Sequence, residues 1–432
     1  MTQNEKMNIQ RRLNRHTFMG QNEFFILFLK SSAVLLYLIG AVWVWCKQSA
    51  IASYAGSIEL LSPVMKAGMT HAFPVYLLLG GAALIYLLLY PFDKRMAKDQ
   101  LQSIGLTNHA GMVPELLRKK RDKGHPRVTI WEFRNQSIPL AEWEDNRAAI
   151  EAALDISIIK MTYGKGKSRV LVYAVPAQID LPEIICWKGK YLSPDSFVLV
   201  LGESLLGPVT VNLAHIPHIL LGGSTGSGKS VLLKLLLMQA MKKGASVFIA
   251  DFKGGVDFPP LWHRDCRICF EEIDLLDLLT GLVAELERRK EIFRTVGCSN
   301  IDTYNKATGE NLQRLIFACD EVAEVLDKTG ADAERKKMLA QIETRLSTIA
   351  RQGRAFGIHL ILATQRPDAA IIPGQIRNNM DFRVCGRADS VLSSIILDNT
   401  DAADLIPKDA RGRFLLHDGT IFQAYWFEES DL

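Results

Sequence analysis

Two stretches near the start of the chain are apolar around the whole circumference of a helix. They cover Phe24–Cys46, which carries only the charge of Lys30, and Ala72–Tyr90, which carries none. A helix of about 20 apolar residues spans the hydrocarbon core of a bilayer. A core helix of a soluble protein rarely stays apolar all round for that length, and the apolar part of a signal peptide is shorter. The pattern predicts two transmembrane helices within residues 24–90, joined by a short external loop.

Positive charge flanks these stretches unevenly, and the loop between them holds only Lys47 and Lys66. Because Lys and Arg concentrate on the cytoplasmic side of a membrane, we expect both ends of the chain in the cytoplasm. Residues 1–23 then form a cytoplasmic segment and residues 91–125 a basic juxtamembrane linker, which anchors the chain as a solvated run or contacts anionic lipid or nucleic acid. The flanking basic residues are Lys6, Arg11, Arg12, Arg15, Lys94, Arg95, Lys98, Arg118, Lys119, Lys120, Arg121 and Lys123.

Strand-length apolar runs alternate with helical patterns in the rest of the chain. Residues 126–196 contain three such runs and one helical stretch, which predicts a small α/β domain without readable chemistry. Residues 197–432 alternate strands with longer helices, as in a mostly parallel sheet covered on both faces. The predicted strands are Val128–Phe133, Ile156–Met161, Arg169–Ala174, Phe197–Leu201, His218–Leu221, Val247–Ala250, Leu315–Cys319, Ile358–Ala363, Phe382–Cys385 and Arg413–Leu416; the predicted helices include Ala141–Leu154, Lys229–Lys243, Leu275–Phe293 and Ala333–Arg351.

Charge and cysteine content add little to this picture. The 432 residues carry a net charge of +4, which is weak evidence for an anionic partner. Cys266 and Cys269 form a CxxC, but no second pair follows at the spacing of a zinc site. Although His263 leaves a metal as an alternative, the seven cysteines are expected to be reduced thiols of a cytoplasmic domain.

The most specific motif is a phosphate-binding loop. Gly223, Ser224, Thr225, Gly226, Ser227, Gly228, Lys229 and Ser230 fit GxxxxGK[ST] at each fixed position. An apolar strand precedes the loop, and a helix continues from Val231. Glycines let backbone N–H groups converge on phosphate oxygens, and the helix N-terminus favours negative charge. We expect ATP here, with Lys229 at the β- and γ-phosphates and Ser230 on Mg²⁺.

A second motif places two acids after the apolar strand at 315–319. Asp320 is expected to complete the Mg²⁺ shell and Glu321 to act as general base on the attacking water; a solvated turn is the alternative. Gln365, after the strand at 358–363, is placed to sense the γ-phosphate. These strand ends share the crevice in which open α/β sheets bind ligands.

Several segments together resemble the FtsK/SpoIIIE family of DNA-translocating ATPases. They are HILLGGSTGSGKS at 218–230, DFKGG at 251–255, LVAELERRKEIF at 282–293, SNIDTYN at 299–305, LIFACDE at 315–321 and GIHLILATQRP at 357–367. The resemblance implies a RecA-like P-loop motor over 197–432 that assembles as a ring, usually a hexamer, with ATP sites between subunits. It also implies that a neighbour's arginine completes each site, for which Arg383 and Arg387 are candidates and Arg377 and Arg354 are rivals.

The layout differs from that of the cell-division members, which have four spans, a long linker and a C-terminal winged-helix module. Two spans and a short linker look like the coupling proteins of Gram-positive conjugative elements, as does the segment at 376–399. The resemblance therefore implies a membrane-anchored translocase that delivers DNA, with its relaxase, to a transfer channel. The alternatives are a chromosome-segregation translocase, a protein-secretion ATPase of the type VII kind, and a nucleotide-gated scaffold that recruits a relaxosome.

Overall fold

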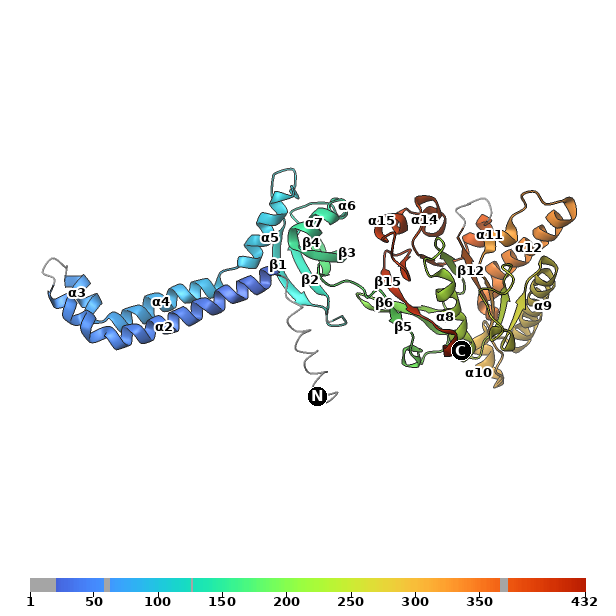
Figure 1. The fold of residues 1–432 in the computed structure, drawn as a ribbon, viewed down its shortest axis with the longest axis horizontal. Coiled ribbons are helices and arrows are strands. Elements are labelled where there is room, and N and C mark those ends of the chain that lie inside the picture. Colours follow the sequence, from blue (N-terminus) through green and yellow to red (C-terminus); the bar gives the residue numbers. More distant parts are fainter. Residues whose placement is uncertain (1–20, 58–62, 126, 366–371) are drawn as a thin grey trace. The chain divides into compact units, whose positions relative to one another are not determined.

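The computed structural model describes residues 21–57, 63–125, 127–365 and 372–432 (Figure 1). Most of the predicted N-terminal segment at 1–23, and part of the predicted external loop, lie outside these residues. The chain divides into two compact units between Asp180 and Leu181. The boundary predicted from the sequence lies at 196/197. The difference arises because β5 (Ile185–Cys186) pairs with a strand of the second sheet.

The first unit begins with an antiparallel helical hairpin of α2 (Gln21–Ser57), α3 (Pro63–Thr70) and α4 (Ala72–Leu89). The first helix is longer than predicted. Two windows, Leu27–Ala55 and Ala72–Leu89, are long and apolar enough to cross a membrane, and only 6% and 0% of them are buried. Such exposure sets them apart from the core helices of a soluble protein.

Two tyrosines join α2 to α4. The rings of Tyr37 and Tyr76 stack with centroids 5.4 Å apart. Tyr76 Oη donates to the Tyr37 carbonyl at 3.0 Å, and Tyr37 Oη donates to the Leu77 carbonyl at 3.2 Å. A Cβ at Gly40 would lie 2.2 Å from Tyr76 Oη, so glycine is what allows the ring to approach. The hairpin is thus fixed by packing and by hydrogen bonds that lipid could not supply.

A small antiparallel sheet with three helices completes the first unit. Its strand order is β1-β2-β4-β3. All three helices cover the same face of the sheet, because each contributes to one core around Phe133. The first helix contributes Ala97 and Leu101, the second Trp143 and the third Ile150. The elements are α5 (Phe92–Ser103), β1 (Glu115–Arg121), β2 (Thr129–Arg134), α6 (Leu140–Asp145), α7 (Arg147–Leu154), β3 (Ile156–Gly164) and β4 (Gly166–Pro176).

The range 91–125, which we predicted to be a linker, therefore contains a helix and a strand of this small domain. The basic run at 118–121 is the second half of β1, paired with β2 through Arg118↔Glu132 to Arg121↔Thr129. Its side chains alternate between the two faces of the sheet. An edge strand with one open face needs few apolar residues, so its sequence resembles that of a charged linker.

The second unit is built on an eleven-stranded mixed sheet. The order along it is β10-β9-β11-β12-β8-β13-β14-β15-β6-β7, with β5 paired to β15. The six strands from β10 to β13 are parallel, and the remaining neighbours along this order pair antiparallel. The strands are β6 (Val198–Ser204), β7 (Gly207–Asn212), β8 (Ile219–Gly222), β9 (Ser246–Ala250), β10 (Cys266–Cys269), β11 (Leu315–Cys319), β12 (Ile358–Thr364), β13 (Phe382–Cys385), β14 (Arg413–Leu416) and β15 (Ile421–Trp426).

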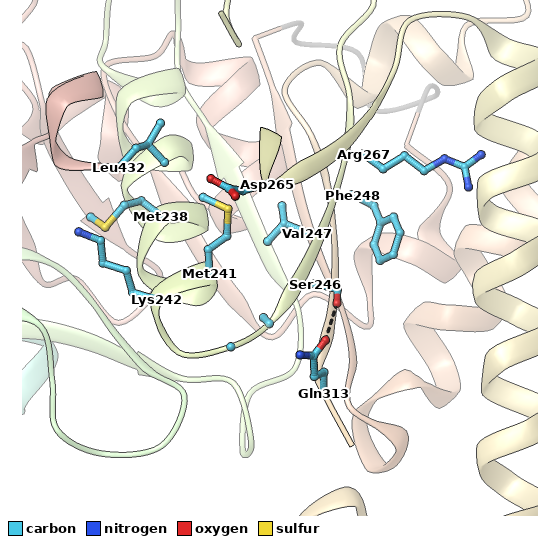
Figure 2. A pocket seen from close by; sticks show the side chains of 12 residues that line it. Met238, Met241, Lys242, Ser246, Val247, Phe248, Asp265, Arg267, Gln313 and Leu432 are labelled. Carbon is cyan, nitrogen blue, oxygen red and sulfur yellow. Dashed lines mark hydrogen bonds between the residues drawn. The ribbon is translucent and has the colours of Figure 1, made fainter. Parts of the chain in front are cut away.

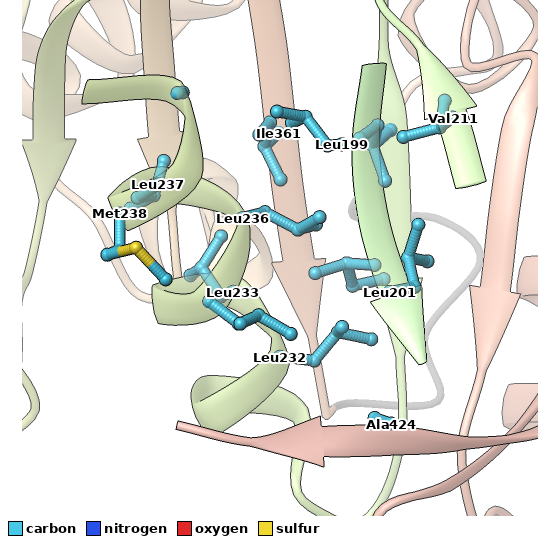
Figure 3. Close-up of a cluster of buried hydrophobic side chains, with 14 of the residues drawn as sticks. Leu199, Leu201, Val211, Leu232, Leu233, Leu236, Leu237, Met238, Ile361 and Ala424 are labelled. Atoms are coloured by element: carbon cyan, nitrogen blue, oxygen red, sulfur yellow. The ribbon is translucent and has the colours of Figure 1, made fainter. Parts of the chain in front are cut away.

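Helices cover both faces of this sheet, as the alternating pattern predicted. On one face α8 (Lys229–Lys242) packs on β6 and β12; Figure 3 shows Leu232, Leu233 and Leu236 of α8 pointing toward Leu199 and Leu201. The other face carries a core formed mainly with α9, α12 and α14. The helices there are α9 (Glu272–Val296), α10 (Ile301–Thr308), α11 (Val322–Leu326), α12 (Ala333–Phe356), α13 (Gly374–Arg377), α14 (Ser390–Leu397) and α15 (Asp401–Leu405).

All seven cysteines lie among the described residues and are free thiols. Cys266 and Cys269 are the first and last residues of strand β10 rather than parts of a metal-binding loop. Cys269, Cys319 and Cys385 are buried, whereas Cys46 and Cys186 are exposed. Burial raises the pKa of Cys385 to about 12 and also raises the pKa of Cys319 beside the acid motif.

Candidate nucleotide site

The phosphate-loop motif joins the end of β8 to the start of α8. Gly228, the residue before α8, has φ +99°, a conformation that L side chains rarely adopt. A Cβ at Gly223 would lie 2.5 Å from Ser227 Oγ. Thr225 and Gly226 are exposed at the tip of the loop. The loop therefore presents backbone to solvent where glycine alone fits.

Segments distant in sequence hold this loop in place. Ser224 N–H donates to the Arg387 carbonyl at 2.7 Å, and Gly412 N–H donates to the Ser227 carbonyl at 2.8 Å. The guanidinium of Arg387 donates to the Thr225 carbonyl at 2.6 Å and to the Lys408 carbonyl at 2.7 Å. Contacts within the same chain therefore shape the loop.

Asp320 lies at the centre of a buried charge cluster. Its Oδ1 is 2.8 Å from Lys229 Nζ and accepts a hydrogen bond from Ser230 Oγ at 2.9 Å. Its Oδ2 is 2.6 Å from Lys253 Nζ. Burial raises the pKa of Asp320, but the two lysines outweigh burial and hold that pKa at about 2. The acid is thus ionised between two cations, and Lys253 comes from the DFKGG segment.

Glu321 is fixed by the end of β12. Thr364 Oγ1 donates to Glu321 Oε1 at 2.7 Å, and Gln365 N–H donates to Oε2 at 2.8 Å. Gln365 Oε1 in turn accepts from Thr225 Oγ1 of the phosphate loop at 2.8 Å. The structure thus brings together Glu321, Gln365 and the loop. Our sequence reasoning missed Thr364 as a positioning residue, although a polar residue closing the apolar run ILA was a signal.

The donor set fits a magnesium nucleotide. The Ser230 hydroxyl and the Asp320 carboxylate meet at hydrogen-bond distance, and these hard oxygens are what Mg²⁺ prefers. Asp251, at the end of β9, is buried, and its Oδ2 has no hydrogen-bond partner among the described residues. Burial raises the pKa of Asp251. Oxygen donors of Ser230, Asp320 and Asp251 are thus available to a cation at the carboxyl ends of these strands.

The two arginines proposed to act on a neighbouring subunit are engaged within their own chain. Arg383 Nη1 lies 2.5 Å from Asp398 Oδ2, and its Nε donates to the Met380 carbonyl, so its side chain is only 14% exposed. Arg387 braces the phosphate loop. Of the two rival arginines, Arg377 has a buried Nε that has no partner among the described residues. Arg354 lies in the last turn of α12, next to the amino end of β12 and so away from the carboxyl ends of the strands. A completing arginine from a neighbour stays a prediction.

A hollow of about 670 Å³ lies where α8 ends and β9 begins. Figure 2 shows Met238 and Met241 on one side of it and Phe248 and Arg267 on the other. Ser246 Oγ donates to Gln313 Oε1 at 2.9 Å along its wall. No residue of the phosphate loop or acid motif lines this hollow, so it is separate from the nucleotide site.

Comparison with known proteins identifies the fold of this site. The family model described as FtsK/SpoIIIE matches residues 191–369. The solved structure of the pCW3 conjugation coupling protein TcpA, in its monomer form with ATPgS, is 37% identical, covers 78% of this chain and 96% of its own, and has a TM-score of 0.58. The chain belongs to the FtsK/SpoIIIE family. The predicted α/β P-loop fold is thereby confirmed.

Curated members of the FtsK/SpoIIIE family match over a smaller share of their length. DNA translocase SftA of Bacillus subtilis is 31% identical over 244 residues, which are 53% of this chain and 25% of that protein. DNA translocase FtsK of Helicobacter pylori is 29% identical over 320 residues, which are 68% of this chain and 36% of that protein. The chain therefore spans about a quarter to a third of the length of these relatives.

Proposed function

We propose that this chain is a membrane-anchored, ATP-driven DNA translocase that acts as a coupling protein in conjugative DNA transfer. The observation that carries the proposal is its similarity to TcpA, described as a conjugation coupling protein, over 96% of the TcpA chain. The matches to FtsK and SftA, named as DNA translocases, extend to 36% and 25% of those proteins and support DNA as the cargo. A relaxase and channel proteins would be the further partners.

The site residues supply the parts of an ATP-hydrolysing motor. Bound Mg²⁺–ATP supplies the phosphoryl group and the metal charge, and Lys229, Ser230 and Asp320 would hold it. Lys229 would exchange Asp320 for phosphate oxygens, which the N–H groups of the loop would orient. Glu321, held by Thr364 and the Gln365 N–H, is positioned to take a proton from water at a carboxylate oxygen.

The membrane helices and the ring complete the proposal. The helical hairpin anchors the chain, with both ends in the cytoplasm, where Lys and Arg flank the spans. Copies of the motor unit assemble in a ring, in our proposal a hexamer, with each site finished by an arginine of the neighbouring subunit. Alternating ATP states around the ring would move DNA through it.

Replacing Lys229 by Ala tests the motor. The variant loses the cation that draws phosphate into the loop, so we expect hydrolysis to fall at least 100-fold, as for loss of one preorganised electrostatic contact. DNA-stimulated phosphate release is measured on the full chain in lipid nanodiscs, and DNA transfer is scored from donors carrying each variant. Lys337→Ala, an exposed lysine of α12, is the matched control.

Two outcomes would count against the proposal. Transfer at the normal frequency by Lys229→Ala would mean that the chain is a scaffold rather than a motor. If the chain does not bind DNA and its ATP hydrolysis does not respond to DNA, a protein cargo would be favoured. Glu321→Gln separates binding from chemistry, since it should keep nucleotide affinity while losing turnover.

A further inference from the structure

The small sheet of the first unit has one open face. Its three helices pack on the face that carries Trp131, Phe133 and Val172. Directly opposed residues of an antiparallel pair lie on the same face, so the register assigns Glu132, Leu171 and their row to the other face. The exposed side chains on that face are Arg118 and Lys120 of β1, Arg134 of β2, Lys160 of β3 and Arg169 of β4.

A buried acid orients two of these arginines. Glu132 is only 4% exposed. Its Oε2 is 2.5 Å from Arg118 Nε, and its Oε1 accepts from Arg169 Nη1. Hydrogen bonds from Arg169 and then Arg118 lower the pKa of Glu132, so the carboxylate stays charged. The Arg118 and Arg169 side chains are nonetheless 62% and 47% exposed. Each guanidinium is planar and has N–H groups beyond the one that Glu132 binds.

The rest of the face extends the positive charge. Arg134 is 3.2 Å from Glu115 and is 59% exposed. Lys160 Nζ lies 4.6 Å from the ring centroid of Tyr173, which is half-buried. Five basic side chains thus stand against two acidic ones, Glu115 and Glu132. Lys165, exposed in the β3–β4 turn, and Lys167, exposed at the start of β4, lengthen the basic surface.

The chemistry of the face favours a phosphodiester backbone over other partners. Membrane insertion and protein interfaces use exposed apolar or aromatic side chains. The large hydrophobic side chains that are exposed among the described residues of this unit all lie outside this face. Fixed arginine forks match phosphate oxygens with two parallel N–H groups, and lysines add mobile point charges.

We propose that this open face, formed by Arg118, Lys120, Arg134, Lys160 and Arg169, binds the sugar–phosphate backbone of DNA. The inference rests on the proposed function, because DNA is the cargo assigned there. It adds a contact outside the motor unit, through which cargo is held independently of the nucleotide state. Binding by charge and planar forks predicts little dependence on base sequence.

The test compares two charge-reversed variants of the full chain in nanodiscs of neutral phosphatidylcholine. Lys120→Glu/Lys160→Glu changes the face without touching the partners of Glu132. Lys94→Glu/Lys123→Glu makes the same charge change at exposed lysines of α5 and of the turn after β1. Affinity for dye-labelled single-stranded and duplex DNA is measured by anisotropy over a range of salt concentrations, without nucleotide.

We expect the face variant to bind DNA at least tenfold more weakly and to lower the slope of log affinity against log salt by about two, since each lost phosphate contact removes about 0.9. The control should stay within about twofold of the unchanged chain. Lys120→Gln/Lys160→Gln repeats the test with neutral side chains, so that a folding defect of the charge reversal is detected.

Equal DNA affinity of face and control variants would overturn the inference while leaving the proposed motor intact. Failure of the unchanged chain to bind DNA at any salt concentration would instead overturn the proposed function. A third result would reassign the face: if phosphatidylglycerol nanodiscs stabilise the unchanged chain and not the face variant, with DNA affinity unaltered, the partner is anionic lipid.

Discussion

Asp320 in the motor unit and Glu132 in the small sheet are both buried carboxylates, and each is held by two cations. The cations of Asp320 are lysines, and the Lys229 side chain is 3% exposed. Those of Glu132 are arginines that are 62% and 47% exposed. A lysine is a single charge on a flexible stem, whereas a guanidinium bonds through a rigid plane. The first arrangement can open to admit a ligand, and the second keeps a surface in one shape.

The largest expected difference between the two clusters is in stability without nucleotide. Asp320→Asn leaves Lys229 buried without its counter-charge and should cost about 3 kcal/mol. Glu132→Gln leaves arginines that water can solvate and should cost about 1 kcal/mol. Calorimetry of the nucleotide-free chain in detergent would measure both. A larger loss of unfolding free energy for Glu132→Gln than for Asp320→Asn would contradict this difference between the two clusters.

Lys253 tests whether the cluster around Asp320 opens to admit Mg²⁺. Its Nζ lies 2.6 Å from Asp320 Oδ2, on the carboxylate that would bind Mg²⁺. Lys253→Met removes this competitor, so the Mg²⁺ concentration that half-saturates binding of a non-hydrolysable ATP analogue should fall about three- to tenfold, a screened like-charge effect. Lys253→Arg keeps the charge and should behave like the unchanged chain. An unaltered Mg²⁺ requirement in Lys253→Met would contradict the idea that Lys253 competes with Mg²⁺ for Asp320.

Arg387 distinguishes bracing within one chain from action on a neighbour. A lysine ammonium lacks the planar fork with which Arg387 donates from Nη1 to Lys408 and from Nη2 to Thr225. Arg387→Lys should therefore lose about 1 kcal/mol of loop support, or about fivefold in nucleotide affinity. The measurement uses dilute, unassembled chains, with Arg354→Lys as the control. Unchanged affinity combined with slower turnover in assembled rings would assign Arg387 to the neighbouring site.

Acid should weaken both clusters in the same direction, and this is the smallest effect. The pKa of Asp320 is about 2 in the folded chain against an ordinary 3.8, and that of Glu132 is also lowered. A lowered folded pKa gives stability that is present above the ordinary pKa and lost as pH falls through the folded one. The nucleotide-free chain should therefore lose stability between about pH 4 and pH 2. Asp320→Asn should flatten that loss in a thermal-unfolding series; an equal loss would contradict the pairing.

The residues of the nucleotide site could be found in the sequence because their signals are local. The phosphate loop has fixed spacing, and the apolar run at 315–319 ends directly at Asp320. Parallel strands then bring such ends together. The bond from Thr364 to Glu321 and the partners of Arg387 could not be found, since they depend on which distant segments meet.

The small domain was harder to predict because its open face removes the apolar alternation of a strand. Glu115–Arg121 reads as a charged linker, yet it is β1 with Leu116 on the core side. β10 was also missed, since a four-residue edge strand carries too little pattern. The hairpin of β6 and β7 was only half predicted: the first strand is a continuous apolar run, whereas the second is short and begins at a glycine.

The buried thiols bear on how this chain will respond to chemical reagents. A thiol reacts as its thiolate and only where a reagent can reach it, and Cys319, next to Asp320, meets neither condition. Cys186, exposed in the second unit, is reachable in the folded chain. A maleimide dye should therefore enter there without disturbing the phosphate loop. Inactivation by an alkylating agent would report unfolding or assembly, and would be no sign of a cysteine in the chemistry.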